Sequence, residues 1–279
     1  MTSKNSGREC GCGVEEIPVI ILCGGMGTRM GAITRDRPKS LIAIQGRPII
    51  WYIVLQLYKD GFRNFFLPLG YKGSLIKDYI ESELSNLPAI RFHCADTGIN
   101  TSIAGRLKNI LAKYSLSQTI LLLNGDAIFD ISLSDIYQTH ISSGLLVSLV
   151  SVEPRSHWSL ILDGQDGVHG FVRGQNIRYI ATSHTPERRA YVYSGIAFIN
   201  RRAFGYIDLA KSNAFEPDLF QALIEKRELA NLKTSRFWFS IDTPKDVSVL
   251  SQTTVGAGFH VNTMRENIVR YFDTTKGSL

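Results

Sequence analysis

The chain has 279 residues, of which 44% are apolar and 20% are charged. This composition is typical of a folded protein with a sizeable apolar core, and it excludes collagens, disordered tails and membrane channels. Thirty-one Lys and Arg against 25 Asp and Glu give a net charge of +6, which favours anionic ligands. The basic residues form no run of the kind that binds nucleic acid, so we expect no nucleic-acid partner.

The first 16 residues are polar and lack the apolar segment of a secretory signal. The most apolar runs, 18–23 and 145–150, are far shorter than the roughly 18 residues that span a bilayer. The four cysteines match neither a zinc ribbon nor a CxxC redox pair. The sequence therefore predicts a cytoplasmic protein with free thiols, no membrane partner and a flexible extension over residues 1–16.

From residue 17, short apolar runs alternate with amphipathic segments, which is the pattern of βαβ units and a largely parallel sheet. The expected strands cover 17–23, 65–69, 90–94 and 119–123, and the expected helices cover 48–58, 74–84 and 104–114. This doubly wound half ends near Asp126.

The second half changes character, because strand-like runs follow one another with little helix between them, which predicts an antiparallel section. These runs cover 145–152, 158–162, 177–182 and 191–199. A helix over 216–228, a final strand over 237–241 and a closing helix over 244–252 follow, the last with Thr243 as N-cap and Pro244 at its first position. The tail has no clear period, but 263–272 favours one more helix.

A glycine-rich loop, CGGMGTR, covers residues 23–29 after the first expected strand. Glycines let backbone N–H groups approach an anion without interference from Cβ atoms. No Gly-Lys-Ser/Thr ends the loop, and Met30 stands where a dinucleotide fingerprint has its third glycine, so neither known loop fits. Arg29 and Lys39 can add a bidentate fork and a point charge to a polyphosphate. The alternative is a plain connection with surface basic residues.

This loop resembles the signature of the sugar-1-phosphate nucleotidylyltransferases. The pattern from Gly24 to Lys39 continues into GRPIIW over 46–51 and GYKG over 70–73, which most resemble the glucose-1-phosphate cytidylyltransferase branch. The resemblance covers residues 17–150 well and 190–250 more loosely. It implies an α/β fold with a doubly wound, mostly parallel, Rossmann-like sheet and an added antiparallel substrate-binding section.

The resemblance also implies how the chain is divided. We expect a single nucleotidyltransferase domain over 17–254, with an NTP-binding half over 17–143 and a sugar-phosphate half over 144–254. Residues 255–279 would form a C-terminal extension, and the protein is expected to be a homo-oligomer.

Two aspartates each follow an apolar strand. Asp126 emerges at the carboxyl end of the expected sheet, where open α/β folds bind ligands, and Asp242 follows the final strand. Mg²⁺ takes one or two protein carboxylates together with phosphate oxygens and waters, and the resemblance implies that family members hold it with an aspartate at each place. The alternative for each is a turn or a helix cap. Asp130 and Asp135 are expected in a turn and at a helix start.

The implied reaction is attack by a sugar-phosphate oxygen on the α-phosphorus of an NTP, with in-line loss of pyrophosphate. Positioning and charge neutralisation can drive this chemistry without a covalent intermediate. A phosphate monoester is already mostly dianionic at neutral pH, so no general base is needed, and the six histidines show no catalytic spacing. The expected catalytic residues are Arg29, Lys39 and Asp126, and the expected cofactor is Mg²⁺.

Residues 96–108, DTGINTSIAGRLK, resemble the segment that the cytidylyltransferase branch uses beside its triphosphate. CTP is therefore favoured, with GTP, UTP and dTTP left open. Gly105 would open a helix whose N-terminus faces phosphate, with Arg106 adding a positive charge; the alternative is an ordinary helix with a solvated Arg106. The expected nucleotide-binding residues are Leu22, Gly24, Gly25, Gly27, Thr28, Thr97, Ser102, Gly105, Arg106 and Gly125.

The acceptor half departs from the family pattern. Members carry Glu-Lys-Pro or Glu-Lys-Gly after a strand, with the lysine on the sugar phosphate, whereas this chain reads GFVRG over 170–174. Arg173 would replace the lysine, and another alignment gives the role to Arg188 or Arg189. A heptose phosphate, a modified-sugar phosphate or a non-sugar phosphate therefore stays open beside a hexose 1-phosphate.

The remaining acceptor residues also come from the resemblance. Tyr193, Ser194 and Gly195 occupy the place of a glycine-rich sugar-binding turn, and Glu216 resembles an acidic residue that contacts sugar hydroxyls, although it could equally serve as a helix-start charge. Together the motifs predict a Mg²⁺-dependent enzyme that makes an NDP-sugar for polysaccharide or natural-product assembly. A non-catalytic nucleotide-sugar-binding module is the rival interpretation.

Overall fold

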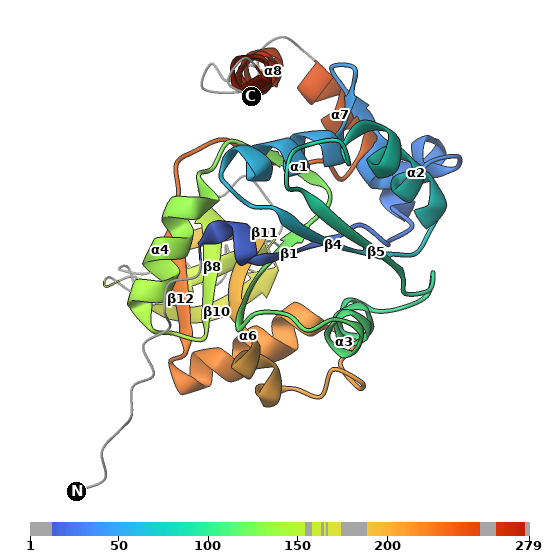
Figure 1. The fold of residues 1–279 in the computed structure, drawn as a ribbon. Coiled ribbons are helices and arrows are strands. Elements are labelled where there is room, and N and C mark those ends of the chain that lie inside the picture. The colour runs from blue at the N-terminus through green and yellow to red at the C-terminus, as the bar shows by residue number, and fades with distance from the viewer. Residues whose placement is uncertain are drawn as a thin grey trace, which may run out of the picture.

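A computed structural model describes residues 13–153, 158–162, 165, 167–173, 189–251 and 261–276. Within these ranges a nine-stranded mixed sheet runs through the molecule, with helices on both faces (Figure 1). The strand order is β10-β9-β11-β6-β1-β4-β5, and β8 and β12 continue the sheet from the opposite edge of β11. Strands from both expected halves of the chain therefore share one sheet.

Four parallel strands form the first part of the sheet, and they confirm the doubly wound half. They are β1 (Pro18–Leu22), β4 (Asn64–Leu69), β5 (Arg91–Asp96) and β6 (Thr119–Asn124). The helices among them are α1 (Ile49–Lys59), α2 (Gly73–Glu83) and α3 (Ile103–Lys113). β1 and β6 are buried on both faces, which explains their continuous apolar runs. Because these strands are parallel, the loops after them meet at one edge of the sheet.

The second part of the sheet is mostly antiparallel, as expected. Its strands are β8 (Val147–Val152), β9 (Trp158–Leu162), β10 (Val168–Arg173), β11 (Arg189–Asn200) and β12 (Leu229–Lys233). β12 pairs in parallel with β8 and was not expected from the sequence. The strand expected over 177–182 lies outside the described residues.

The long strand β11 changes its partner along one edge. Its first half, from Arg189 to Val192, pairs with β9, and its second half, from Ile196 to Asn200, pairs with β6. The pairing with β8 on the other edge shifts register between Tyr193 and Ile196, which marks a β-bulge. The sheet therefore splits beside this bulge, between β6 and β9.

A separate two-stranded sheet lies next to the main one. It pairs β7 (Ala127–Phe129) with β13 (Trp238–Ser240) in antiparallel register, with Ser240 opposite Ala127. The final strand expected from the sequence therefore exists, but it pairs with β7 and not with the main sheet. A second small hairpin pairs β2 (Ala43–Ile44) with β3 (Arg47–Pro48).

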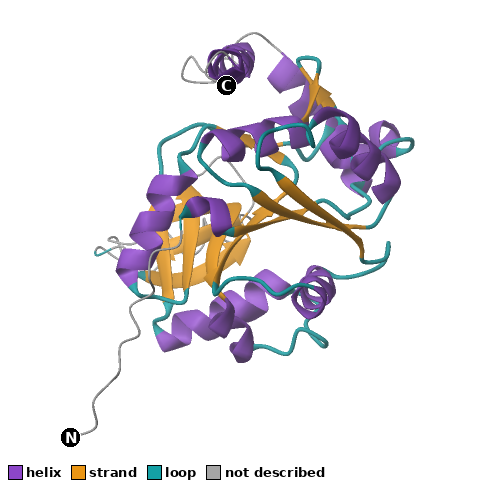
Figure 2. Cartoon of the chain, viewed as in Figure 1, coloured by secondary structure: helices purple, strands orange, loops and turns teal. Residues whose placement is uncertain are grey.

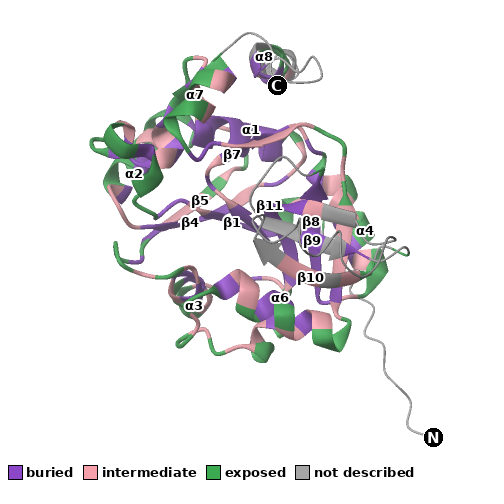
Figure 3. Ribbon diagram, turned by 180° about the vertical axis from the view of Figure 1, so that it is seen from behind, coloured by how far each residue is buried: buried purple, intermediate pink, exposed green. Residues whose placement is uncertain are grey.

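Helices form a layer on each face of the main sheet (Figure 2). On one side of the sheet lie α1, α2 and α4 (Leu133–Ser143). Farther out on this side, α7 (Pro244–Ser251) packs against β2 and α8 (Val261–Lys276) packs against α1. The other side of the sheet packs against α3 and α6 (Phe215–Lys226). Figure 3 shows α1 and the central strands buried, whereas α2, α3 and α6 each expose an outer side. α8 confirms the expected tail helix and extends it.

The start of the described chain is folded onto the core. Val14–Glu16 of the expected N-terminal extension form a 3-10 turn, and Val14 packs against the core. In the ranges that the structure describes, no helix is both long and apolar enough to cross a membrane.

Candidate active site

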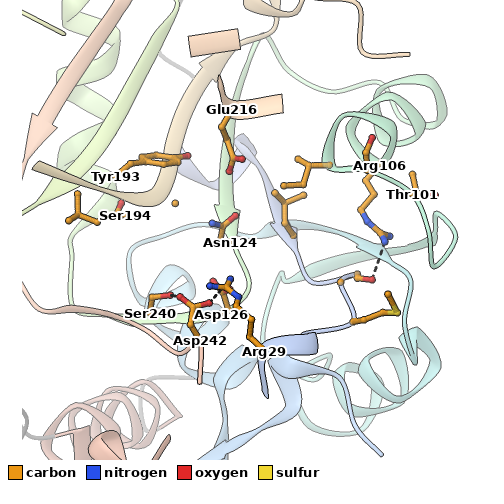
Figure 4. A pocket seen from close by; sticks show the side chains of 18 of the residues that line it. Arg29, Thr101, Arg106, Asn124, Asp126, Tyr193, Ser194, Glu216, Ser240 and Asp242 are labelled. Atoms are coloured by element: carbon orange, nitrogen blue, oxygen red, sulfur yellow. Dashed lines mark hydrogen bonds and ion pairs between the residues drawn. The ribbon is translucent and has the colours of Figure 1, made fainter. Parts of the chain in front are cut away.

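A cavity of about 910 Å³ opens beside the bulge of β11 (Figure 4). One side, which we call the loop wall, consists of two segments. The first, at and after the end of β1, contributes Leu22, Gly24, Gly25, Met26 and Arg29, and the second, at the start of α3, contributes residues 99–103 and Arg106. The opposite side, the strand wall, consists of Phe171, residues 192–195 of β11 and Glu216. Clefts at the carboxyl ends of strands, where the strand order changes, are the usual ligand sites of open α/β sheets.

Asp126 and Asp242 meet where the two walls join. Asp126 directly precedes β7 and Asp242 closely follows β13, so the pairing of these strands brings two residues 116 positions apart in the chain together. The Ile241 N–H donates to the Asp126 carbonyl at 2.9 Å and closes this small sheet. The expectation that both aspartates belong to one site is consistent with this arrangement.

The Lys39 ammonium lies between the two carboxylates. Its Nζ donates to Asp126 Oδ2 at 2.7 Å and to Asp242 Oδ1 at 2.9 Å. Arg29 Nη2 approaches the same Asp242 oxygen at 2.9 Å. Two cations and two carboxylates from four separate segments thus form one charge cluster at the base of the cavity.

The Asp242 carboxylate is stabilised in its charged form. Burial opposes its ionisation, but attraction to Lys39 and hydrogen bonds from Lys39 and Ser240 outweigh burial and lower its pKa below the ordinary value. Ser240 Oγ donates to Asp242 Oδ2 at 2.9 Å, so both carboxylate oxygens have partners. Asp246 fixes the backbone here, since its carboxylate accepts from the N–H groups of Asp242 and Thr243.

α7 begins at Pro244, which confirms the expected N-cap position of Thr243 and the expected first position of Pro244, but the side-chain contacts at this helix start differ from those of a simple N-cap. The Thr243 hydroxyl donates to Asp246 Oδ2 at 2.9 Å instead of accepting a backbone N–H as an N-cap would. The Asp246 carboxylate, three residues after Thr243, accepts hydrogen bonds from the backbone N–H groups of Asp242 and Thr243 at the start of the helix.

The donor set at this cluster fits a hard divalent cation. Asp126 and Asp242 direct carboxylate oxygens to within 3 Å of the same Lys39 nitrogen, so both can face one positive centre. Among the described residues, no group of three or more His, Cys, Asp or Glu side chains could hold a metal. A Mg²⁺ ion bound here would therefore take its remaining oxygens from a phosphate ligand and from water.

The glycines of the loop wall have different roles. A Cβ at Gly24 would come within 2.3 Å of the Arg106 guanidinium, so this glycine is required by packing. Gly25 has open space around its Cα and faces the cavity. Gly27 is in the left-handed region at φ +63° and begins the 3-10 segment Thr28–Thr34, whose Arg29 lines the cavity. Gly27 and Thr28 themselves shape the loop and are not among the lining residues.

Arg106 is buried, which excludes the solvated side chain of the alternative interpretation. Its guanidinium donates to the carbonyls of Leu69 at 2.9 Å and Gly24 at 3.0 Å, and to Thr97 Oγ1 at 2.6 Å. Thr97 in turn donates to the Leu69 carbonyl at 2.6 Å. Arg106 therefore joins the loops after β1, β4 and β5 at the edge of the cavity, which it also lines.

The start of α3 also differs from the expectation. The helix begins at Ile103, two residues before Gly105, because Ser102 is its N-cap and accepts the Gly105 N–H at 3.1 Å. Ser102 lines the cavity, so the N-terminus of α3 does face it, but Gly105 does not line it.

The strand wall has a layer of aromatic rings, with polar side chains on the side that faces the cavity. Phe171, Tyr193 and Phe220 pack edge to face with ring centroids 5.3–5.7 Å apart. Ser194 and Gly195 form part of the bulge within β11, which corrects the expectation of a turn. The Ser194 hydroxyl donates to the Val150 carbonyl at 2.8 Å, so it serves the bulge.

Glu216, in the first turn of α6, points into the cavity above this wall (Figure 4). Burial, reinforced by the negative charge of Asp126, raises its pKa above the ordinary value. Burial and the charge of Glu216 also raise the pKa of the Tyr193 phenol. The strand wall thus presents a neutral phenol and a carboxyl that retains its proton more readily than usual.

Several cavity residues were not expected from the sequence. Asn124, Phe171, Trp238 and Ser240 line it, as do Met26 and residues 99–101. Asn124 stands two residues before Asp126 in the sequence, and this closeness was the only available signal. Conversely, Thr97 and Gly125 support the loops from behind, and the Arg173 side chain and residue Arg188 lie outside what the structure describes, as does the Arg189 side chain.

Comparison with known proteins gives a consistent picture. Residues 18–254 match the family model described as nucleotidyl transferase. A probable glucose-1-phosphate cytidylyltransferase from Bacillus subtilis is 29% identical over 247 residues, which cover 82% of this chain and 92% of the relative. A D-glycero-alpha-D-manno-heptose 1-phosphate guanylyltransferase from Aneurinibacillus thermoaerophilus is 23% identical and covers 81% and 94%.

A solved structure of a putative glucose-1-phosphate thymidylyltransferase from Bacillus anthracis superimposes with a TM-score of 0.70 over 84% of this chain and 94% of that one, at 15% identity, which confirms the fold. The sequence relatives confirm the resemblance to sugar-1-phosphate nucleotidylyltransferases. The chain therefore belongs to the nucleotidyl transferase family and is a nucleotidyltransferase.

Proposed function

We propose that the protein joins an NTP to a sugar 1-phosphate in the cavity, with CTP as the first choice of nucleotide and Mg²⁺ as the cofactor. The observation that carries the proposal is the convergence of Asp126, Asp242, Lys39 and Arg29 at the junction of the two walls. The two cations can pair with phosphate oxygens and the two carboxylates can hold a metal ion, and the cavity volume of about 910 Å³ lies within the usual range of ligand pockets.

In this reaction an oxygen of the sugar phosphate attacks the α-phosphorus of the NTP. A new P–O bond forms, the bond between the α-phosphorus and its bridging oxygen breaks, and pyrophosphate leaves with the electron pair. The attacking phosphate is already ionised at neutral pH, so no side chain has to remove a proton. The residues of the cavity act by orienting the two phosphates and balancing their charge.

The loop wall suits the nucleotide. Gly25 leaves its backbone open to a phosphate, and Ser102 presents the N-terminus of α3 to the cavity. Lys39 and Arg29, which contact the aspartates here, are the cations that would turn to the triphosphate. Asp126 and Asp242 would then hold Mg²⁺, which neutralises phosphate charge when bound.

The choice of CTP rests on the Bacillus subtilis relative and on the similarity of residues 96–108 to the cytidylyltransferase branch. Other relatives are named for GTP or dTTP, and one for a heptose phosphate. The polar side chains Asn100, Thr101 and Ser102 line the loop wall where a base would be read. The acceptor is a hexose or heptose 1-phosphate in this proposal.

The direct test measures pyrophosphate release from each of four NTPs with a panel of hexose and heptose 1-phosphates, with and without Mg²⁺. We expect release with CTP and a sugar 1-phosphate, and its loss on chelation of Mg²⁺. Nucleotide binding by calorimetry without release across the whole panel would contradict transfer and favour the binding-module interpretation.

A further inference from the structure

Asn124 is the last residue of β6 and lies in the middle of the cavity. In Figure 4 its side chain lies between Glu216 of the strand wall and Asp126 at the junction. Its Cα pairs with Leu22 of β1 on one edge of the strand, and the preceding residue pairs with Ile196 of β11 on the other. Asn124 thus stands between the two walls.

The absence of a side chain at Gly195 lets the Asn124 amide pack against the strand wall. A Cβ at Gly195 would come within 2.5 Å of Asn124 Nδ2, so the amide lies directly over the Gly195 backbone. Gly195 is also in the left-handed region at φ +76°, inside the bulge of β11. The close approach of the amide and the positive φ both require glycine at position 195, and they place the Asn124 amide against the strand wall.

The seated amide remains available to a ligand. None of the hydrogen bonds among the described residues uses the Asn124 side chain, and it is half-buried and lines the cavity. By contrast, the neighbouring Ser194 hydroxyl is taken by the Val150 carbonyl. An amide carries both a donor and an acceptor, so it pairs well with a hydroxyl, which also has both.

The position of Asn124 in the cavity, between Asp126 and Glu216, points to one hydroxyl of the sugar. A sugar 1-phosphate has its phosphate on C1, and under the proposed function this phosphate lies toward Asp126 while the ring lies toward Tyr193 and Glu216. The position between these ends belongs to the carbon next to C1. We infer that Asn124, seated by Gly195, determines specificity by binding the C2 hydroxyl of the acceptor; this inference rests on the proposed function.

The test compares glucose 1-phosphate with 2-deoxyglucose 1-phosphate, using the NTP that gives most pyrophosphate in the panel above. For the wild-type enzyme we expect kcat/KM to be about tenfold higher with the hydroxyl than without it, a ratio equal to about 1.4 kcal/mol. Asn124→Ala should bring this ratio close to one, because activity on glucose 1-phosphate falls about tenfold more than activity on the deoxy sugar. A purely structural role would reduce both activities equally.

Two further variants complete the experiment. Gly195→Ala should also reduce the ratio, because its methyl group displaces the amide. Asn213→Ala, an exposed asparagine that does not line the cavity, is the matched control and should keep the wild-type ratio. Circular dichroism and thermal melting show whether each variant folds.

The outcomes separate the two proposals. A wild-type enzyme that uses both sugars equally, or an Asn124→Ala enzyme that retains the wild-type ratio, overturns the role of Asn124 and leaves nucleotidyl transfer standing. Failure of the wild-type enzyme to release pyrophosphate from any sugar 1-phosphate contradicts transfer itself and removes the inference with it.

Discussion

The two walls of the cavity differ in the role of their most buried polar group. In the loop wall, the Arg106 guanidinium is buried and bonded to the protein itself, whereas Arg29 is exposed at the cavity. In the strand wall, Glu216 and the neighbouring Asn124 face the cavity. A buried ionic group is costly to leave unpaired, so a paired one holds its surroundings in a single arrangement.

This difference indicates two kinds of recognition. The loop wall is shaped by a fixed internal brace and offers backbone groups and a helix N-terminus, which suit phosphates. The strand wall has an apolar layer of three aromatic rings behind a few free polar groups, which suits the varied hydroxyls of a sugar. Lys39 lies at the junction and bonds to the aspartates from both small strands.

The largest effect is expected at the junction. Asp126→Asn removes the negative charge of the carboxylate where the two walls meet. We expect pyrophosphate release to fall about 100- to 1,000-fold, as for the loss of one electrostatic group in an active site. The matched control is Asp130→Asn, because Asp130 is close in the chain but does not line the cavity. Full activity in Asp126→Asn would show that the two walls do not meet at a catalytic centre.

An intermediate effect is expected in the loop wall, on stability. Arg106→Ala leaves the carbonyls of Gly24, Leu69 and Ile99 and the Thr97 hydroxyl without their charged donor, and we expect the free energy of unfolding in urea to fall by about 3 kcal/mol. Lys108→Ala, an exposed change on the same helix, should stay within about 0.5 kcal/mol of wild type.

Arg106→Lys is a second variant of the same residue. An ammonium cannot span the four acceptors as a planar guanidinium does, so this variant should recover only part of the lost stability. If Arg106→Ala and Lys108→Ala have the same free energy of unfolding, the hydrogen bonds of Arg106 do not stabilise the loop wall.

The smallest effect is expected in the strand wall, on the pH dependence of stability. The folded protein raises the pKa of Glu216 above its ordinary value of 4.5, so the native state holds this proton more tightly than the unfolded chain does. Stability therefore falls as pH rises from about 4.5 through the raised folded pKa and then levels off.

Glu216→Gln lacks this contribution, so its unfolding free energy should rise relative to wild type between pH 4.5 and pH 8. Urea unfolding at several pH values measures the difference, and Glu225→Gln, an exposed change on the same helix, is the control. Parallel curves for wild type and Glu216→Gln would mean that the strand wall does not hold this carboxyl in its protonated form.

Much of the sheet could be predicted because its strands are buried on both faces or bounded by turns. β1 and β6 are continuous apolar runs that no solvent-facing segment would tolerate. β12 could not be found in this way, because LANLK is short and half polar, and only its pairing with β8 makes it a strand. The partner of β13 was equally hidden, since β7 has only three residues.

The residues of the site likewise divide into those that the sequence could single out and those that it could not. Asp126 and Asp242 could be singled out because each follows an apolar strand. The role of Arg106 could not be predicted, because a basic residue on an amphipathic helix has the same pattern whether it faces water or the interior. Burial against Gly24 and the Leu69 carbonyl decides between the two cases, and those contacts join segments distant in the chain.

By itself, the sequence determined the parallel strands β1, β4, β5 and β6 with the helices among them, the glycine-rich loop and the two aspartates, because these depend on neighbouring residues. Only the tertiary structure decided that Lys39 lies between the aspartates, that Arg106 is an internal brace and that Asn124 rests over Gly195. Each of these facts depends on the pairing of strands far apart in the chain, and such pairing follows from the packing of the whole sheet.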